Sequence, residues 1–438
     1  MTLPSGFDGP RWLSAHVNLE SIGVPAGARR GAPTLERIGT LMQYLGSPEV
    51  EFPAVHITGT NGKTTTVRVL TELLTTLGLK VGAYTSPHLE RVNERMSIDG
   101  VAIDDDAFEE MLYAVSLVEE SVGVHPSYFE IVTAAAFRWF ADEAVDVAVV
   151  EVGMGGTWDA TNVVDGQVAV VTNVSIDHAD YLGNTREQIA REKAGIVKPG
   201  STLVLGETDP KLQAIFEERG AAKVFRRNAE FGVARNVLAV GGRLVDFDTP
   251  AAEYPDVFLP LHGAHQADNA AIALTAAEAF VNAPLPFDVV ADGLSRVQSP
   301  GRLEIVGRRP LVLLDGAHNV AGAQALRAAL AEEWGDGLRT LVVGLLHEKE
   351  PHEMLSALGL DELEGFLVCC RPPSPRALDP AFVAKAAVDL GFPEERIEVV
   401  DRVEEAVSTA LLLTPEEGQI VITGSLYVVG AARSVLVS

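Results

Sequence analysis

The sequence predicts an α/β protein with two domains: a first that carries a phosphate-binding loop and a smaller, Rossmann-like second. The first observation is a β-branched run at residues 55–57, followed by a glycine-containing stretch at residues 58–65 and by apolar residues at helical spacing up to residue 77. The second is that strand-like and helix-like stretches alternate along most of the chain, which is typical of βαβ units and a parallel sheet. The third is the length of 438 residues, which corresponds to two or three domains.

The stretch at residues 58–65 has the composition and the surroundings of a phosphate loop. Backbone N–H groups at the start of a helix point at an anion, and Lys63 adds a positive charge. The match to the common pattern G-x-x-x-x-G-K-[ST] is incomplete, because Ile57 stands at the position of its first glycine and the nearest glycine is Gly59. The alternative is an ordinary strand and helix joined by a glycine-rich turn.

The charge balance argues against two classes of partner. The chain has 61 acidic and 34 basic residues and a formal net charge of −27, so we expect neither nucleic acid nor an anionic membrane surface as partner. Residues 1–10 carry no signal-peptide pattern, and no apolar run approaches the ~20 residues of a membrane-spanning helix. Adjacent cysteines rarely pair, so Cys369 and Cys370 indicate reduced thiols. We therefore expect a soluble, cytoplasmic, monomeric protein.

Polar residues gather where the predicted strands of the first domain end. Strands are predicted at residues 55–57, 80–85, 145–152 and 168–174, and polar clusters lie at residues 58–65, 85–88, 151–159 and 177–178. Ligands bind at the carboxyl ends of parallel strands, so we expect these clusters to share one site. Residues 206–260 indicate an irregular β insertion, and residues 298–302 are the best linker candidate. The domains are therefore expected to cover residues 1–299 and 300–438.

Three polar side chains near predicted strand ends could coordinate one metal ion. Glu151 ends a strand that we expect near the phosphate loop, where nucleotide enzymes place an acid for Mg²⁺, and Ser86 and His178 occupy comparable positions. The alternative for Glu151 is a solvated strand-end carboxylate, and a lone histidine after an aspartate is more often structural. A neutral imidazole is also an unusual ligand for Mg²⁺.

Five further residues have both a functional and a structural interpretation. Lys193 lies near a predicted helix end. It could be a solvated lysine favoured by the helix dipole or a charge partner of phosphates. Arg302 could reach a nucleotide held between the domains, or be a surface arginine. Asp315 and His318 follow the first predicted strand of the second domain, which could cap that nucleotide. Asn269 could hydrogen-bond an adenine edge, although a lone helical asparagine is more often inert.

Taken together, the motifs resemble those of the folylpolyglutamate synthase and dihydrofolate synthase family, a branch of the Mur-type ATP-dependent amide ligases. The resemblance spans roughly residues 35–430 in the right order. In the first domain it is carried by GTNGKT at 59–64, TSPHL at 85–89, NER at 93–95, YFE at 128–130, EVGMGG at 151–156, DATN at 159–162, DH at 177–178, LG at 182–183 and EKAGI at 192–196. In the second domain it is carried by PGRLE at 300–304, DGAHN at 315–319 and TGSLY at 423–427.

This resemblance implies a fold and a set of roles. The fold would be a P-loop domain of the Mur ligase central type followed by a Rossmann-like ligase domain. ATP would be bound by Thr60, Asn61, Gly62, Lys63, Thr64, Asn269, Arg302 and Asp315. The ligands of Mg²⁺ would be Ser86, Glu151 and His178, and the catalytic residues would be Lys63, a carbamylated Lys193 and His318. The pterin substrate would contact Ser127, Tyr128, Phe129, Glu130, Trp158, Asp159 and Ala160.

The implied reaction joins L-glutamate to dihydropteroate, to folylpolyglutamates or to both, through an acyl phosphate formed with ATP. Thr64 departs from the family, in which most members have glycine after the lysine, and residues 347–350 receive no role. Two alternatives stay open. A peptidoglycan-type Mur ligase would need an N-terminal domain for its UDP-sugar, for which residues 1–54 leave no room. A regulatory nucleotide-binding module without turnover would have no need of the set Lys63, Glu151, His178 and Lys193.

Overall fold

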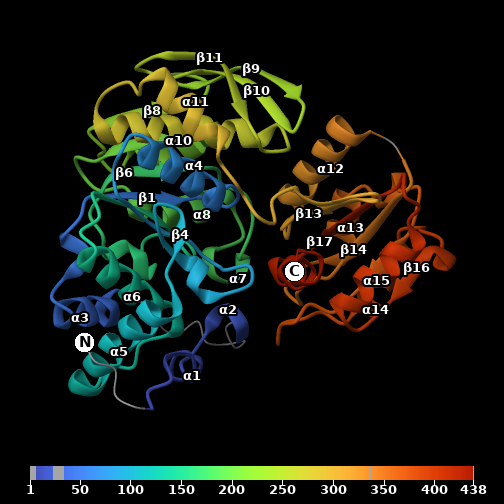
Figure 1. The fold of residues 1–438 in the computed structure, drawn as a ribbon, viewed down its shortest axis with the longest axis horizontal. Helices are drawn as coiled ribbons and strands as arrows, with labels where there is room; N and C mark the ends of the chain where they lie inside the picture. Colours follow the sequence, from blue (N-terminus) through green and yellow to red (C-terminus); the bar gives the residue numbers. More distant parts are fainter. Residues whose placement is uncertain (1–5, 23–33, 336, 438) are drawn as a thin grey trace. The chain divides into compact units, whose positions relative to one another are not determined.

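The computed structural model describes residues 6–22, 34–335 and 337–437, and it has two compact units (Figure 1). Unit 1 is formed by Met1–Pro260 and Gln266–Val297, and unit 2 by Leu261–His265 and Gln298–Ser438. The N-terminal stretch that carries no signal-peptide pattern lies partly outside the described residues. The chain therefore enters unit 2 for five residues, returns to unit 1, and enters unit 2 again within the stretch predicted as a linker.

A mostly parallel sheet forms the centre of unit 1. Its strand order is β4-β3-β2-β5-β1-β6-β7-β8, and only β3 and β4 at one edge pair antiparallel. The strands are β1 (Ala54–Thr58), β2 (Val81–Tyr84), β3 (Met96–Ile98), β4 (Val101–Ala102), β5 (Val147–Glu151), β6 (Gly166–Val171), β7 (Thr202–Leu205) and β8 (Lys223–Arg226). The loops that follow β2, β5, β1 and β6 leave the same edge of the sheet, where the sequence predicts the site.

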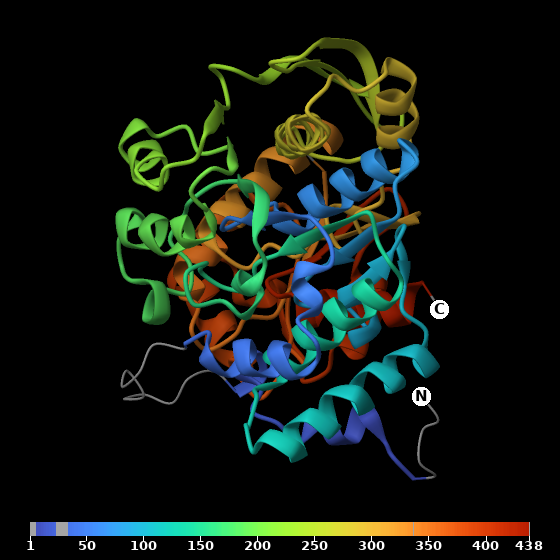
Figure 2. The same ribbon diagram turned by 90° about the vertical axis from the view of Figure 1, so that its left-hand side faces the viewer.

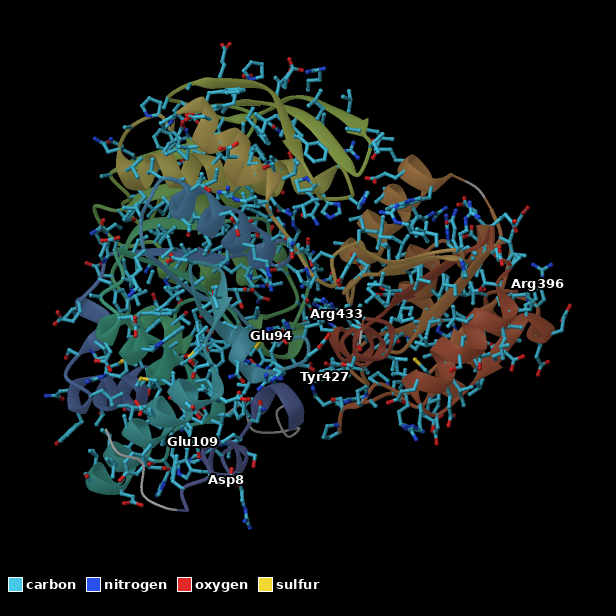
Figure 3. The ribbon with its side chains drawn as sticks, viewed as in Figure 1. Asp8, Glu94, Glu109, Arg396, Tyr427 and Arg433 are labelled. Atoms are coloured by element: carbon cyan, nitrogen blue, oxygen red, sulfur yellow. The ribbon has the colours of Figure 1, made fainter. Side chains whose placement is uncertain are left out.

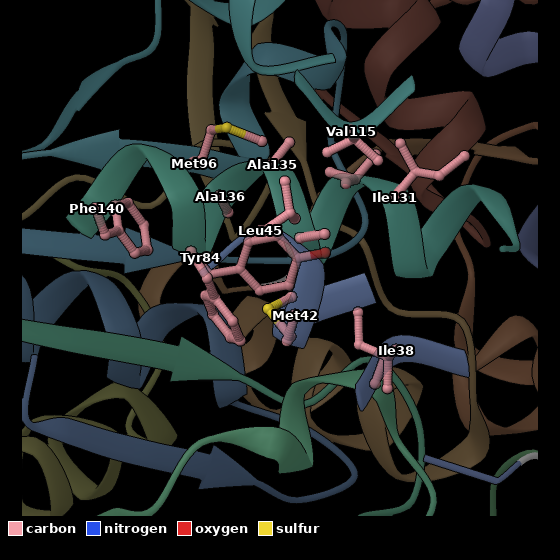
Figure 4. Packing of buried hydrophobic residues seen from close by; sticks show 14 of the residues in the cluster. Ile38, Met42, Leu45, Tyr84, Met96, Val115, Ile131, Ala135, Ala136 and Phe140 are labelled. Atoms are coloured by element: carbon pink, nitrogen blue, oxygen red, sulfur yellow. The ribbon is translucent and has the colours of Figure 1, made fainter. Parts of the chain in front are cut away.

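Two apolar clusters join several helices of unit 1 to this sheet. The helices are α1 (Gly9–Ser14), α2 (Leu19–Ile22), α3 (Glu36–Tyr44), α4 (Lys63–Thr76), α5 (Asp105–Val122), α6 (Tyr128–Asp142), α7 (Ala179–Leu182), α8 (Arg186–Lys193), α9 (Pro210–Glu217), α10 (His265–Val281) and α11 (Phe287–Ser295). One cluster packs α3, α5 and α6 against β2 and β5, and Figure 4 shows Tyr84, Phe140 and Ile38 within it. The other packs α8 and α9 against β6 and β7. Helices α5 and α6 lie side by side (Figure 2).

The stretch 206–260, predicted as an irregular β insertion, also contains a helix and a strand of the main sheet. After α9 and β8, the strands β9 (Gly232–Ala239), β10 (Gly242–Asp248) and β11 (Glu253–Leu259) form a separate antiparallel sheet. Helix α9 was not predicted, because it is short and buries only Leu212 and Phe216. Its start is nevertheless marked by the N-cap Asp209, which accepts from the N–H of Lys211, and by Pro210.

Unit 2 is built on a second parallel sheet with the order β12-β13-β17-β14-β15-β16. Its strands are β12 (Glu304–Arg308), β13 (Leu311–Leu314), β14 (Arg339–Val343), β15 (Leu367–Cys369), β16 (Ile397–Val399) and β17 (Gln419–Thr423), and its helices are α12 (Val320–Trp334), α13 (Pro351–Ala357), α14 (Pro380–Asp389), α15 (Val403–Leu413) and α16 (Leu426–Leu436). Only β12 runs antiparallel. Arg433 of α16, labelled in Figure 3, fastens this edge strand through bonds of 3.1 Å to Glu304.

The predicted fold class is confirmed: a loop-bearing α/β unit precedes a smaller α/β unit. Within the described ranges, no helix has both the length and the apolar character that crossing a membrane requires.

Candidate active site

The phosphate loop connects β1 to α4 at the carboxyl edge of the main sheet. Gly62 is the N-cap of α4 with φ +84°, a conformation that favours glycine. A Cβ at Gly62 would lie 2.4 Å from Oδ1 of Asn269, so the side chain from α10 packs directly on the loop. Asn269 is itself held by a 2.9 Å bond from its Nδ2 to Oε1 of Gln266. The structure therefore brings Asn269, predicted as a nucleotide contact, to the loop.

The loop is held by the residues that follow β6. Thr172 Oγ1 and Asn173 Nδ2 both donate to the carbonyl of Asn61, at 2.7 and 2.9 Å. In return, the N–H of Asn61 donates to Oδ1 of Asn173 at 3.1 Å. Gly59 has no room for a side chain, since a Cβ there would lie 1.8 Å from Oγ1 of Thr172. The loop is therefore preorganised by Thr172 and Asn173, two residues to which the sequence analysis gives no role.

Two lysine side chains converge on one carbonyl of the loop. Lys63 Nζ donates to the carbonyls of Gly59 and Thr60, each at 3.2 Å. Lys193 Nζ donates to the same Gly59 carbonyl at 2.8 Å and is only 4% exposed. Burial, and next the positive charge of Lys63, lower the pKa of Lys193 to about 7. Lys193 is thus not the solvated helix-end lysine of the structural alternative, and a large share of it is a neutral amine near pH 7.

Helix α8 carries Lys193 to the loop because its last turn is fastened to the glycine-rich turn after β5. The N–H and Oγ1 of Thr157 both donate to the carbonyl of Glu192 at 3.1 Å. A Cβ on Gly156 would lie 2.8 Å from the carbonyl oxygens of Glu192 and Lys193, so only glycine allows this approach. The turn and the lysine therefore form one structural element.

Glu151 lies at the end of β5, beside the start of α4. Its side chain is buried, and Oγ1 of Thr64 donates to its two carboxylate oxygens at 3.1 and 3.0 Å. Ser86 follows β2, the neighbour of β5, and is also buried, whereas the side chain of His178 is 40% exposed. No three His, Cys, Asp or Glu side chains of the described ranges cluster tightly enough to hold a metal by themselves. The structure thus pairs Glu151, one of the three expected metal ligands, with Thr64, which is expected to contact ATP.

The predicted substrate segment at the start of α6 has a structural role of its own. Ser127 is the N-cap of α6, and its N–H and Oγ1 both donate to Oε2 of Glu130 at 2.7 Å. Oε1 of Glu130 accepts from Nε of Arg37 at 3.2 Å. Both carboxylate oxygens of Glu130 are therefore engaged, Oε2 within a capping box and Oε1 by Arg37, and the sequence pattern S-x-x-E at 127–130 is the signal for the capping box.

The aromatic residues expected to bind the pterin lie in two different clusters. Tyr128 and Phe129 belong to the cluster of α3, α5 and α6, and Ala160 joins them there. Trp158 packs instead against the cluster of α8 and α9. Phe129 faces the turn after β5, because a Cβ on Gly153 would lie 2.5 Å from Cζ of its ring. Asp159, on that same turn, is buried, and burial raises the pKa of its carboxyl.

Arg95 is a buried cation beside Tyr128, and it was not a functional candidate from the sequence. The guanidinium of Arg95 lies 5.5 Å from the centroid of the Tyr128 ring, forms an ion pair with Glu20, and donates from Nε to Nδ1 of His88 at 2.9 Å. Burial, and next the charge of Arg95, lower the pKa of His88 to about 4. The only sequence signal was the placement of Arg95 and His88 in two of the family motifs.

In unit 2, the three predicted residues lie around the turn after β13. The carboxylate of Asp315 accepts from the N–H groups of Leu303 and Ala317, each at 2.9 Å. Burial raises the pKa of Asp315, against the effect of the nearby charge of Arg302. The guanidinium of Arg302 lies over Gly316, since a Cβ there would be 2.5 Å from Nη1. Finally, Nδ1–H of His318 donates to the Gly316 carbonyl at 2.8 Å. Asp315 and His318 thus order a single turn.

Known families match both units. The "Mur ligase middle domain" matches residues 57–277, and the "Mur ligase, glutamate ligase domain" matches residues 301–426. A dihydrofolate synthase/folylpolyglutamate synthase from Mycobacterium tuberculosis is 40% identical over 92% of this chain and 90% of its own.

Solved structures agree with these matches. Escherichia coli FolC in complex with DHPP and ADP has a TM-score of 0.86 and 29% identity, and the match covers 99% of both chains. A bifunctional folylpolyglutamate synthase/dihydrofolate synthase from Yersinia pestis, complexed with AMPPNP and a Mn ion, has a TM-score of 0.86 and 28% identity over 100% of both chains.

Proposed function

This chain belongs to the folylpolyglutamate synthase and dihydrofolate synthase family of Mur-type ligases, and we propose on this basis that it uses ATP to join L-glutamate to dihydropteroate, to folylpolyglutamates or to both. The observation that carries the proposal is the convergence of Lys63 and Lys193 on the loop carbonyl of Gly59, with the pair formed by Thr64 and Glu151 on the same helix start. A module that only binds a nucleotide has no need of a buried amine with a lowered pKa at the phosphate loop.

In this proposal the loop at the start of α4 binds the phosphates of ATP. Thr60, Asn61 and Gly62 form the loop itself, whose Thr60 and Asn61 N–H groups are bonded to Asn173, and Lys63 supplies positive charge. The nucleotide complexes of the E. coli and Y. pestis relatives support this assignment. The remaining proposed contacts to ATP are made by Asn269, which lies against the loop, and by Arg302 and Asp315 from unit 2.

Mg²⁺ is the proposed metal, with Ser86, Glu151 and His178 as the residues that would hold it. The donors present fit a hard cation in part: Glu151 offers a buried carboxylate, and Thr64 and Ser86 offer hydroxyls. An incomplete protein ligand set is expected for Mg²⁺, which keeps waters and binds substrate phosphates. When bound, it would neutralise charge on the transferring phosphoryl group. The Mn ion in the Y. pestis relative supports a divalent cation there.

Lys193 is the proposed site of a carbamate. The neutral amine attacks the carbon of CO₂, one C–N bond forms, the π bond of one C=O breaks to leave an oxyanion, and a proton leaves to solvent. A pKa of about 7 keeps a large share of the amine neutral near pH 7. The product is an anion beside Lys63, so the electrostatic repulsion that lowers the pKa of the amine becomes an attraction.

The proposed reaction has two steps. A carboxylate oxygen of the pterin substrate attacks the γ-phosphorus of ATP, the bond to the β-phosphate oxygen breaks, and ADP leaves. The amine of L-glutamate then attacks the acyl carbon, phosphate leaves, and a proton is released as the amide forms. Lys63 stabilises the charge of the first step, and His318 is proposed to act near the reacting groups.

The proposed contacts to the pterin substrate come from two segments that meet at Gly153. They are Ser127, Tyr128, Phe129 and Glu130 at the start of α6, and Trp158, Asp159 and Ala160 in the turn after β5. The engaged carboxylate of Glu130 favours an indirect role for that residue, in which it holds the helix start that presents Tyr128 and Phe129.

The test is release of ADP by the whole chain with ATP, MgCl₂ and L-glutamate. Dihydropteroate is compared with a reduced folate monoglutamate, and reactions without glutamate are the control. We expect glutamate-dependent ADP release with at least one of the two acceptors. Activity with both would assign a bifunctional enzyme, and no turnover with either would contradict the proposed function.

Further assignments accompany this function as predictions. The ATP-binding domain is assigned to residues 1–299 and the ligase domain to residues 300–438. A cytoplasmic location, a monomeric state and the lack of nucleic-acid partners also stay predictions.

A further inference from the structure

His56 occupies a position on β1 that would suit an apolar side chain. β1 is the strand that leads into the phosphate loop, and all five of its residues are buried. The residues beside His56 in register are Val150 on β5 and Ala169 on β6. Its Nδ1 is buried and has no hydrogen-bond partner within the described ranges. Because a buried polar atom without a partner is costly, the presence of histidine here calls for a compensating interaction.

That interaction is a hydrogen-bonded chain that ends at Asp159. Nε2 of His56 lies 2.9 Å from Oγ1 of Thr161, and Oγ1 of Thr161 lies 2.5 Å from Oδ1 of Asp159. The carboxylate accepts the hydroxyl proton, so the hydroxyl oxygen is left to accept from His56. His56 is therefore the neutral tautomer that carries its proton on Nε2. Burial, and next the charge of Lys198, lower the pKa of His56 to about 3, in agreement with a neutral ring.

The carboxylate of Asp159 in turn fixes the turn after β5. Its Oδ2 accepts from the N–H of Met154 at 2.9 Å, and the N–H of Gly153 bonds to the same carboxylate. Gly153 is held between Asp159 and Phe129, since a Cβ there would lie 3.2 Å from Oδ2 of the one and 2.5 Å from Cζ of the other. The orientation of Asp159 therefore decides where this turn meets the Phe129 ring.

We infer that His56 and Thr161 are positioning residues that hold the Asp159 carboxylate, and through it the turn at Gly153 and Met154, in the geometry that receives the pterin part of the acceptor substrate. The inference rests on the proposed function, which places Phe129 and Asp159 at that substrate. It adds a role for a histidine that lies on the strand before the phosphate loop and takes no part in phosphoryl transfer.

The test uses substitutions that separate the hydrogen bond from the packing. Thr161→Val replaces the hydroxyl by a methyl group of similar size, whereas Thr161→Ser keeps the hydroxyl. His56→Leu removes the donor, whereas His56→Gln offers an amide N–H in place of Nε2–H. Thr275→Val is the stability control, because it removes a buried hydroxyl that donates to the carbonyl of Ala271 within α10.

Thr161→Val loses the hydroxyl bond to the Asp159 carboxylate, and His56→Leu loses the bond that orients this hydroxyl. Each substitution is expected to raise the KM for dihydropteroate about 10-fold. The KM for ATP should stay within about twofold of the wild-type value, since the loop keeps its bonds to Thr172 and Asn173. Thr161→Ser and His56→Gln should restore most of the affinity for dihydropteroate. An unchanged KM for dihydropteroate with only a lower Tm, as expected for Thr275→Val, would overturn the inference. An equal rise in both KM values would overturn it as well.

A second measurement does not depend on catalysis. Hydrogen exchange followed by mass spectrometry reports on the amide of Met154, which is bonded to Asp159. Exchange there should become faster in Thr161→Val and remain slow in Thr161→Ser. If the wild-type chain turned over neither acceptor, the proposed function would fail, while this exchange would still decide whether Thr161 holds Asp159. Unchanged exchange in Thr161→Val would contradict the positioning role.

Discussion

Lys63→Ala is expected to lower kcat for glutamate-dependent ADP release by about 10²–10³, the typical effect of removing one preorganised charge or donor from a transition state. Lys63 Nζ is the cation that already lies on the loop, bonded to the carbonyls of Gly59 and Thr60. In the reaction it would leave these carbonyls for the γ-phosphate. The measurement is steady-state ADP release together with nucleotide binding by calorimetry.

The matched control for this substitution is Lys211→Ala, which removes an exposed lysine from α9 and should leave kcat unchanged. Both variants should unfold within a few degrees of the wild-type protein. Formation of the acyl phosphate at the wild-type rate in Lys63→Ala would show that the loop does not hold the γ-phosphate.

Lys193→Gln is expected to reduce ligation to background, because the variant can neither be carbamylated nor carry an anion beside Lys63. Wild-type activity should fall when CO₂ is removed from the buffer and should return with added bicarbonate. Activation by bicarbonate requires the neutral amine. Since the pKa of Lys193 is lowered to about 7, activation should weaken as the pH falls below about 7 and should be greatest above it.

Carbon-13 NMR of the protein equilibrated with labelled bicarbonate should detect one carbamate. The signal should be lost in Lys193→Gln and kept in Lys198→Gln. Lys198 is a useful control because burial also lowers its pKa, whereas its amine bonds to Asn162 and not to the loop. Wild-type turnover by Lys193→Gln, or a signal that survives in it, would remove the carbamate from the mechanism.

The parts of the site that could be predicted from the sequence are those that follow from local patterns and one rule of topology. The strand, loop and helix at residues 54–76 are encoded by adjacent residues, and β1 and α4 form where the pattern predicts them. Glu151 and Ser86 reach the edge that carries the loop because parallel strands end together. The family resemblance, confirmed by the comparisons, then assigned chemistry to that edge.

The parts that could not be predicted depend on contacts between distant segments. Nothing near Thr172 and Asn173 in the sequence indicates that their side chains bond to the loop more than a hundred residues away. Nothing local in the sequence indicates that Arg95 is buried, yet it is 1% exposed and lies beside Glu20 and Tyr128. His56 reads as part of a β-branched run, and its purpose is visible only when Thr161 is placed beside it.

Glu130 shows that one local pattern can carry two interpretations. Glu130 is a predicted substrate contact, but the same four residues form the capping-box pattern, and both oxygens of the carboxylate bond within the helix start or to Arg37. The local pattern was thus sufficient to predict the bonds to Ser127, whereas the bond to Arg37 depends on tertiary structure.

The central claim is that a phosphoryl group passes to the carboxylate of the acceptor before the amide forms. Its most direct test is a reaction with dihydropteroate, or the folate acceptor that turns over, labelled with oxygen-18 in the carboxylate that becomes the amide. The account predicts that each turnover transfers one labelled oxygen to inorganic phosphate. The labelled oxygen bridges carbon and phosphorus in the acyl phosphate, and its bond to the acyl carbon breaks when glutamate attacks. Amide formation with unlabelled phosphate would contradict it.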